Sequence, residues 1–173
     1  MARLIIAILL SISAATLDAT VHEQGKGNLP LGTINTPDGV TIIVINNSGE
    51  QITIQVSETA AQLPVGRYRI DNWTMERRDK DGSIWKLTGK YFGKKGVFDV
   101  IEGQEVKLPA GEPVFSFLTV SKANSMYRFS HRLTGQLSET VEITKNGSRP
   151  DPPKLQIANA ENSYQETLTF KYG

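Results

Sequence analysis

The pattern of apolar and polar positions along the chain predicts a series of short β-strands. Val40–Asn46 is a β-branched run that is apolar on both faces, which is typical of a strand buried between two layers. Gln51–Val56 follows a turn at Asn47–Gly49 and alternates strictly between polar and apolar positions. The two segments together predict a β-hairpin.

The apolar parity reverses in the next segment. Tyr68 and Ile70 share one face of a predicted strand, whereas Trp73 and Met75 take the opposite parity. One additional residue in a strand reverses the direction of the side chains that follow it. The pattern therefore predicts a β-bulge at residues 71–72.

Polar turn residues separate the remaining apolar segments at intervals of roughly 8–12 residues. After a turn at Asp79–Gly82, a strand is predicted that carries Trp85, Leu87 and Tyr91. Further strands are predicted at Val97–Ile101, Glu105–Leu108, Val114–Ser121, Met126–Leu133, Glu139–Thr144, Lys154–Ala158 and Gln165–Tyr172. Helical periodicity is weak and confined to Ser57–Gln62. We expect an all-β fold, an antiparallel β-sandwich of the immunoglobulin or transthyretin type.

Residues 1–15 have the three parts of a secretory signal peptide. Arg3 supplies a positive charge, Leu4–Leu10 is an unbroken apolar run, and small residues follow up to Ala15. We expect cleavage after Ala15 or, as an alternative, after Ala19, and a periplasmic or extracellular location. The apolar run is too short to span a bilayer, and no later segment is long and apolar enough to do so.

The rest of the chain divides by composition into three parts. Residues 16–39 are rich in glycine, proline and polar residues and are interpreted as a loose N-terminal segment. Residues 40–108 and 109–173 are each interpreted as half of a sandwich or as a small subdomain. Leu63–Gly66 and Leu108–Gly111 begin similar successions of strands and turns in the two parts. One larger sandwich and two small tandem sandwiches both agree with this repetition.

Charge and cysteine content narrow the classes of partner and chemistry. Without Arg3, 18 of the 19 lysine and arginine residues remain against 18 acidic residues, so net charge indicates neither a nucleic-acid partner nor an anionic membrane. The absence of cysteine excludes disulfides, thiolate nucleophiles and cysteine-based zinc sites. Packing alone must therefore hold the fold together, and we expect no cofactor.

Leu63–Ile70 reads Leu-Pro-Val-Gly-Arg-Tyr-Arg-Ile, in which Pro64, Gly66 and Tyr68 form a proline-x-glycine-x-tyrosine pattern. This bend resembles that of carboxypeptidase-regulatory-like and transthyretin-like β-sandwiches, in which a loop turns into a strand with an inward tyrosine. The whole chain after the signal also resembles uncharacterised exported β-sandwich proteins of bacteria, with Gly111–Pro113 opening its second half. The resemblance implies a fold and a non-catalytic accessory role, and it implies no particular activity.

Residues that usually carry catalysis are sparse. His22 and His131 form no spaced pair, and His131 alternates with apolar residues of a predicted strand, which favours a packed core histidine. The Gly-x-Ser-x-Gly and His-Glu-x-x-His signatures are absent. Asp79–Gly82 resembles the opening of a calcium loop, but the later ligands do not follow, which favours a plain turn. We expect no enzyme and no metal site. A hydrolase whose carboxylate pair is assembled by the fold stays as a third alternative.

Aromatic and basic residues of segment 67–95 form the candidate ligand-binding set. The segment has nine lysines and arginines against four acidic residues, an excess that an acidic polysaccharide would complement. The candidate residues are Trp73, Trp85, Tyr91, Phe92, Arg77 and Arg78. Exposed aromatic rings can stack against sugar rings, whereas the alternative for the same rings is a place in the core.

Two functions follow as hypotheses. The first is an exported, non-enzymatic β-sandwich that acts as an accessory, adhesion or cell-envelope interaction module. The second is a carbohydrate-binding module that uses residues 67–95. The corresponding partners are envelope proteins and polysaccharide, and neither hypothesis involves nucleic acid.

Overall fold

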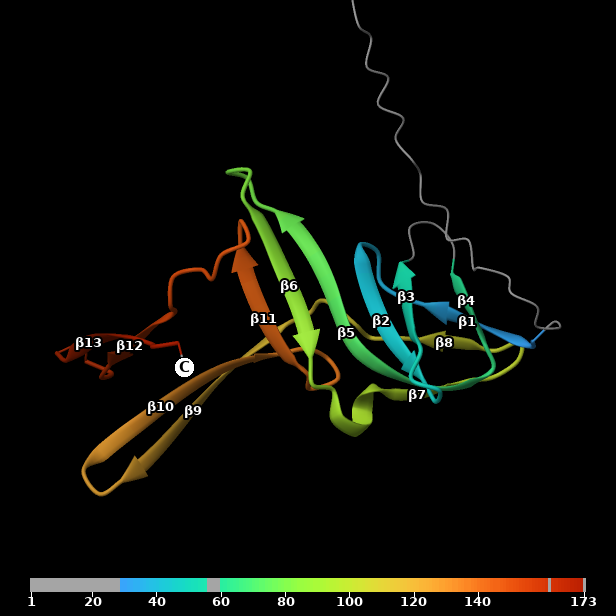
Figure 1. The fold of residues 1–173 in the computed structure, drawn as a ribbon. Coiled ribbons are helices and arrows are strands. Elements are labelled where there is room, and N and C mark those ends of the chain that lie inside the picture. The colour runs from blue at the N-terminus through green and yellow to red at the C-terminus, as the bar shows by residue number, and fades with distance from the viewer. Residues whose placement is uncertain (1–28, 56–59, 162, 173) are drawn as a thin grey trace, which may run out of the picture.

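The chain folds almost entirely into β-strands, as the sequence predicts (Figure 1). The computed structural model describes residues 29–55, 60–161 and 163–172, so the predicted signal peptide and its cleavage sites lie outside the described residues. The strands are β1 (Leu31–Asn35), β2 (Val40–Asn46), β3 (Gln51–Gln55), β4 (Ala61–Pro64), β5 (Gly66–Arg78), β6 (Ile84–Lys90), β7 (Val97–Val100), β8 (Glu105–Lys107), β9 (Phe115–Ala123), β10 (Met126–Thr134), β11 (Thr140–Lys145), β12 (Lys154–Ala158) and β13 (Gln165–Thr169). A short 3-10 helix, η1 (Gly93–Gly96), follows β6.

Two sheets form the body of the molecule. The small sheet has the order β4-β1-β8, and the large sheet has the order β3-β2-β5-β6-β11-β10-β9 with β7 paired to β5. Paired strands are antiparallel except β1 and β8, which are parallel. β12 and β13 form a separate antiparallel hairpin. None of the helices in the described ranges is long and apolar enough to cross a membrane.

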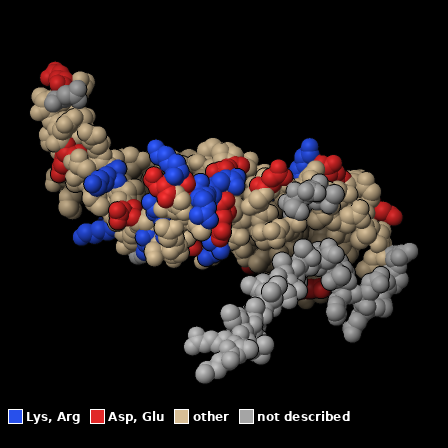
Figure 2. Space-filling view, turned by 90° about the horizontal axis from the view of Figure 1, so that it is seen from above, with Lys and Arg blue, Asp and Glu red and all other residues tan. Residues whose placement is uncertain are grey.

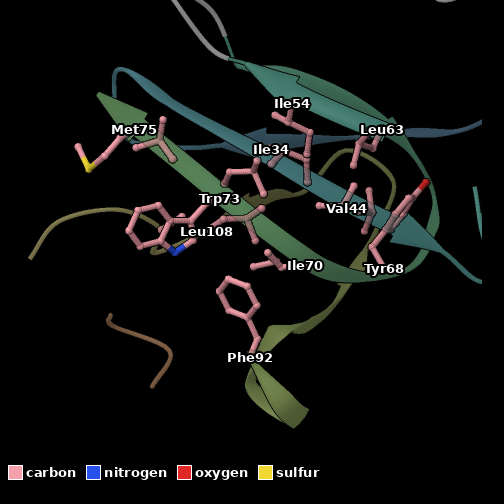
Figure 3. Packing of buried hydrophobic residues seen from close by; sticks show 14 of the residues in the cluster. Ile34, Val44, Ile54, Leu63, Tyr68, Ile70, Trp73, Met75, Phe92 and Leu108 are labelled. Atoms are coloured by element: carbon pink, nitrogen blue, oxygen red, sulfur yellow. The ribbon is translucent and has the colours of Figure 1, made fainter. Parts of the chain in front are cut away.

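The hydrophobic core lies between the small sheet and the β2-β5 region of the large sheet. Figure 3 shows Ile34 and Leu63 from the small sheet among Val44, Ile54 and Trp73 from the large one. All five side chains are buried, and burial of such a side chain contributes roughly 1.5–3 kcal/mol. This arrangement is sandwich-like, in agreement with the expected fold class.

Residues from both of the predicted parts, 40–108 and 109–173, contribute to this core. Val141 of β11 is buried in it, and Leu133 of β10 packs against it. The buried hydrophobic residues described for the second range form no cluster of their own. From Leu133 toward the turn that joins them, β9 and β10 extend away from the body as a long hairpin, visible at the lower left of Figure 1.

The apolar pattern correctly predicts the centre of the large sheet. β2 pairs with both β3 and β5 and so lies inside the large sheet, with Val40, Ile42 and Val44 buried and the residues of its other face half-buried. In the pairing of β2 with β5, Ile43 lies opposite Asn72 and Val44 lies opposite Ile70. Asp71 is therefore the additional residue, and the predicted bulge is confirmed.

Two strands of the small sheet were not predicted, and the loose-segment interpretation of residues 16–39 is wrong for its described C-terminal part. β1 lies within it and pairs with both β4 and β8. Gly32 suggested a loop, but a Cβ atom there would lie 2.6 Å from the carbonyl oxygen of Ile101, so glycine is needed for close strand approach. The weak helical pattern of Ser57–Gln62 is likewise wrong at Ala61 and Gln62, which belong to β4.

Tyr68 closes the bend that precedes β5. Its ring is buried and stacks on Phe98, with ring centroids 5.7 Å apart, and its hydroxyl donates a hydrogen bond of 2.8 Å to the carbonyl oxygen of Pro64. Burial, with a smaller contribution from the charge of Glu50, raises the pKa of the Tyr68 hydroxyl. The hydroxyl therefore stays a hydrogen-bond donor at neutral pH. The family resemblance of this bend stays a prediction.

Candidate functional site

The structure separates the six residues that the sequence suggested for ligand binding. Trp73 has no exposed surface and Phe92 is 6% exposed, so neither ring can stack on a ligand, which corrects the expectation for these two. Trp85 is half-buried and Tyr91 is 78% exposed. Trp85 is the second residue of β6 and Tyr91 follows its last residue, so their backbones are about 20 Å apart at the usual rise per strand residue. The aromatic residues therefore form no common platform.

Trp73 instead takes part in a buried polar contact that the sequence did not reveal. Its indole Nε1–H donates a 2.7 Å hydrogen bond to Oε1 of Glu139, and the backbone N–H of Leu137 donates a 2.9 Å bond to Oε2. Glu139 is completely buried. A Cβ atom on Gly89 would overlap the Trp73 indole, and one on Gly135 would overlap the Glu139 carboxylate. The two glycines leave room for the contact. The only sign of this contact in the sequence was a glycine in the strand next to that of Trp73, at Gly89.

Trp85 belongs to a contact at the other end of β6. Its indole N–H donates a 2.9 Å hydrogen bond to Asp79 Oδ2, and the Lys145 ammonium lies 5.1 Å above the indole ring and 4.0 Å from the same carboxylate oxygen. The hydrogen bond from Trp85 is the main cause that lowers the pKa of the Asp79 carboxyl, with additional bonds from the backbone N–H groups of Ser83 and Asp81. Trp85 thus fastens the 79–83 turn to β6 and β11.

We expect the Asp79→Asn substitution to destabilise the protein at pH 7 and to have a smaller effect in acid. The pKa of Asp79 is lower in the folded chain than its usual value of 3.8, so its stabilising contribution is complete above the unfolded-state value and is lost as the pH falls through the folded value. Urea denaturation of both proteins at several pH values measures the gap in unfolding free energy. Asp81→Asn in the same turn is the control. A gap that does not narrow in acid would contradict the assignment.

The arginines and lysines of residues 67–95 do not form a surface of one sign. Arg77 lies 3.3 Å from Glu112, and Lys90 lies 3.0 Å from Glu142. Arg78, also exposed, donates to the carbonyl oxygen of Gly82 rather than to a carboxylate. Seen from above in Figure 2, lysine, arginine and carboxylate side chains intermingle over the middle of the molecule. Acidic residues from outside the segment 67–95 thus offset part of its basic excess.

Tyr91 borders an open hollow of about 380 Å³, here called the Tyr91 hollow. The residues lining it are Arg69, Ile70, Asp71, Asn72, Lys90, Tyr91, Phe92 and Gly93. Tyr91 has a positive φ of 64°, which is uncommon for an aromatic residue and costs of order 1–3 kcal/mol. The bulge residue Asp71 accepts a 2.9 Å hydrogen bond from Asn72 at the same place. The hollow thus combines an exposed ring with donors, acceptors and two cations.

The hairpin of β9 and β10, residues 115–134, is here called the arm. It joins the rest of the large sheet through one pair of residues, Thr134 and Thr140. Every residue of β9 is exposed. The exposed large hydrophobic residues of the arm, with exposed fractions from 45% to 71%, are Phe115, Phe117, Leu118, Val120, Met126 and Tyr127. Apolar groups are thus exposed along the whole length of the arm.

The two faces of the arm follow from its register. Leu118 pairs with His131 and Val120 pairs with Phe129, so these four side chains share one face. His131 is therefore half-buried on the arm rather than packed in the core as expected, with Nε2 2.9 Å from the hydroxyl of Ser116. Phe170, just after β13, lies against the imidazole at 5.6 Å between ring centroids. The segment that follows the C-terminal hairpin thus touches this face at His131.

The arm is basic as well as apolar. Residues 115–134 contain Lys122, Arg128 and Arg132 and no acidic residue. Lys122 lies 5.2 Å above the Tyr127 ring, and Arg132 lies 5.5 Å above the Phe117 ring. The sequence predicted these strands but not their exposure, because strands with apolar residues on both faces usually lie inside a protein. The missed indication was the long stretch without an acidic residue.

No protein-family model, no curated protein and no solved structure matches the chain. The structure defines its class as an all-β, sandwich-like protein. In the parts of the chain that the structure describes, no group of three or more histidine, aspartate or glutamate residues is placed to hold a metal ion. The Tyr91 hollow and the arm are the two exposed features from which we infer a function.

Proposed function

We propose that the protein is an exported, non-enzymatic interaction module that binds a cell-envelope partner through the arm. The observation that carries this proposal is the exposure of apolar side chains along residues 115–134. With about 200 Å² per large side chain, roughly half exposed, the six residues present on the order of 600 Å² of apolar surface. That area is at the upper end of what monomeric proteins expose, and larger apolar surfaces are typical of interaction sites.

The low stability expected of an isolated arm supports the same proposal. A two-stranded hairpin without a third strand or a packed face is marginally stable in water. The arm pairs with β11 at one position only, and just its base contacts the core. A partner that covers the arm would remove its apolar groups from water at about 25 cal/mol per Å². Part of this gain would be offset by the loss of freedom on association.

Carbohydrate binding is the second candidate function, and the Tyr91 hollow favours it. An exposed aromatic ring beside carboxylate, amide and cationic groups is the combination that sugar hydroxyls and ring faces require. The site differs from the one that the sequence suggested, because Trp73 and Phe92 are buried and Trp85 is engaged by Asp79 and Lys145. Tyr91 is the one residue of the predicted set with a widely exposed aromatic face.

One experiment with two variants tests both functions. The purified protein is applied to an envelope-polysaccharide array and to a biosensor that carries detergent-solubilised envelope proteins. The arm variant combines Leu118→Thr with Val120→Thr, which removes apolar surface but keeps β-branched residues in the strand. Tyr91→Ala is the hollow variant. Circular dichroism and the urea midpoint of each variant establish that the fold is kept.

The two variants separate the outcomes. The proposed function predicts saturable binding to envelope proteins that falls at least tenfold in the arm variant and is retained in the Tyr91→Ala variant. Binding to polysaccharide that is lost in the Tyr91→Ala variant alone would replace the proposal with the carbohydrate module. Binding that neither substitution weakens, or no binding by a well-folded protein, would overturn both functions.

A further inference from the structure

We propose that the outer edge of β9 pairs with β9 of a second copy of this chain, antiparallel and centred on Thr119. This inference rests on the proposed role of the arm as an interaction element and names the partner of its free edge. The resulting four-stranded sheet, with the order β10-β9-β9-β10 across the two copies, would leave the faces of both arms available to an envelope partner.

β9 is an unprotected edge. It is the last strand of the large sheet, with β10 on one side and, among the residues that the structure describes, no strand on the other. An edge strand presents unpaired backbone N–H and C=O groups, and proteins usually protect such edges with proline, charges, bulges or short length. Phe115–Ala123 is nine residues long, contains no proline and carries one charge, Lys122, near its tip. Its pairing with β10 is continuous from end to end, without a bulge.

The β9 sequence is compatible with itself in the antiparallel register that pairs all nine residues. Thr119 is the midpoint of Phe115–Ala123, so in this register it lies opposite its own counterpart. Leu118 then lies opposite Val120 of the second copy, and Val120 opposite its Leu118. Direct cross-strand pairs of apolar residues contribute roughly 0.2–1 kcal/mol each. Two such apolar pairs therefore flank the symmetry axis.

The charges of the arm do not oppose this register. Lys122 lies opposite Ser116 of the second copy, and the two Lys122 residues are separated by six residues along the strands, about 20 Å. Arg128 and Arg132 belong to β10, so in the pair of arms they flank the new sheet on its outer strands. The two β10 strands are three strand spacings apart, about 14 Å, which exceeds the Debye length of about 8 Å at physiological salt. Like charges are therefore screened from one another.

The edge supplies the contacts that a stable dimer needs. Nine residues paired with nine make about nine backbone hydrogen bonds, close to the average of about ten for a standard protein interface. A third and a fourth strand also relieve the marginal stability of a two-stranded hairpin. An isologous contact of this kind closes after two copies, so it yields a dimer rather than a filament.

A single cysteine tests the register, because the chain has none of its own. The Cα atoms of residue 119 in the two copies are expected at about 4.5–5.5 Å, within the range that a disulfide bridges. Thr119→Cys treated with diamide, which takes up the two electrons and two protons of the thiols, is expected to run at twice the monomer mass on a non-reducing gel. Ser121→Cys is the matched control, because its two copies are about 13 Å apart in this register.

A charge exchange tests the contact itself. Leu118→Lys combined with Val120→Lys places like charges opposite one another, and sedimentation analysis is expected to show that this variant is monomeric where the wild type is dimeric. Leu118→Glu combined with Val120→Glu is expected to be monomeric for the same reason. An equimolar mixture of the two variants is expected to restore the dimer, which mere misfolding of either variant would not allow.

Defined outcomes overturn the inference. The first is a wild-type protein that stays monomeric at about 100 μM, where a micromolar Kd would give mostly dimer. The second is equal cross-linking of the Thr119→Cys and Ser121→Cys variants. The third is a mixture of the lysine and glutamate variants that forms no dimer. Binding of the arm to vesicles of anionic lipid by a monomer, weakened by salt, would assign the edge to a membrane surface instead. A monomer that still binds envelope proteins through the arm overturns this inference and keeps the proposed function. A dimer that binds no envelope component does the reverse.

Discussion

Replacing Glu139 with alanine is expected to lower the free energy of unfolding by roughly 3–5 kcal/mol. The substitution leaves the buried Trp73 indole N–H and the half-buried Leu137 backbone N–H without their acceptor, and each such loss costs about 1–3 kcal/mol. The small alanine side chain also leaves a cavity. A typical domain has an unfolding free energy of about 5–15 kcal/mol, so this loss is close to the entire stability of a domain at the lower end of that range. Urea denaturation followed by tryptophan emission measures the difference.

Glu142→Ala is the matched control for this prediction. Glu142 is on β11, beside the turn that holds Glu139, but its carboxylate is exposed and pairs with Lys90 at 3.0 Å. Exposed ion pairs contribute about 0–1 kcal/mol, so the control is expected to lose no more than that. Equal losses in the Glu139→Ala and Glu142→Ala variants would show that the buried contact with Trp73 has no special weight.

Gly89→Ala is expected to destabilise the protein by roughly 2–4 kcal/mol, although it adds one methyl group. The new Cβ atom would overlap Nε1 of Trp73, a side chain that is fully buried and cannot move into solvent. Overpacking of this kind typically costs 1–3 kcal/mol, and displacement of the indole would also weaken its hydrogen bond to Glu139. Thermal and urea unfolding measure the loss, and a red-shifted tryptophan emission would report the displaced ring.

Gly66→Ala is the control for the Gly89→Ala variant. Gly66 is also a strand glycine, but the nearest atom to a Cβ atom built on it is a Tyr68 ring carbon at 3.7 Å, which is an ordinary contact. The substitution is expected to change stability by less than about 0.5 kcal/mol. A Gly89→Ala variant as stable as the control would mean that Trp73 has room that the structure does not show.

The apolar pattern predicted the centre of the large sheet well because one face of β2 and of β5 is buried at regular positions. β2 and the bulge at Asp71 are examples, since both follow from which side chains face the core. β1 and β4 escaped prediction because their strand character depends on pairing with residues far along the chain. Gly32 illustrates this, since the close approach of Val100 and Ile101 explains a glycine there.

The candidate site could be predicted only in part, because a local sequence pattern does not determine whether a side chain is exposed. Trp73 in the middle of β5 and Tyr91 just after β6 are both aromatic, yet one is fully buried and the other is 78% exposed. Trp73 packs in the core, where the Glu139 carboxylate accepts its indole N–H, whereas Tyr91 follows the end of β6 with a positive φ of 64°. The arm shows the same limit, since its sequence predicted strands and its lack of cover belongs to the tertiary structure.

The arm is joined to the rest of the large sheet by one strand pair, Thr134 with Thr140. It can therefore open while the body stays folded. Local opening of a segment with few buried contacts costs much less than global unfolding, so backbone amides of the arm should exchange with solvent hydrogen through such local openings. A bound partner would then order the arm at the moment of binding, and part of the contact energy would be spent on that ordering. The measured affinity therefore reports the difference between contact and ordering, while the slowing of amide exchange reports how often the arm is occupied.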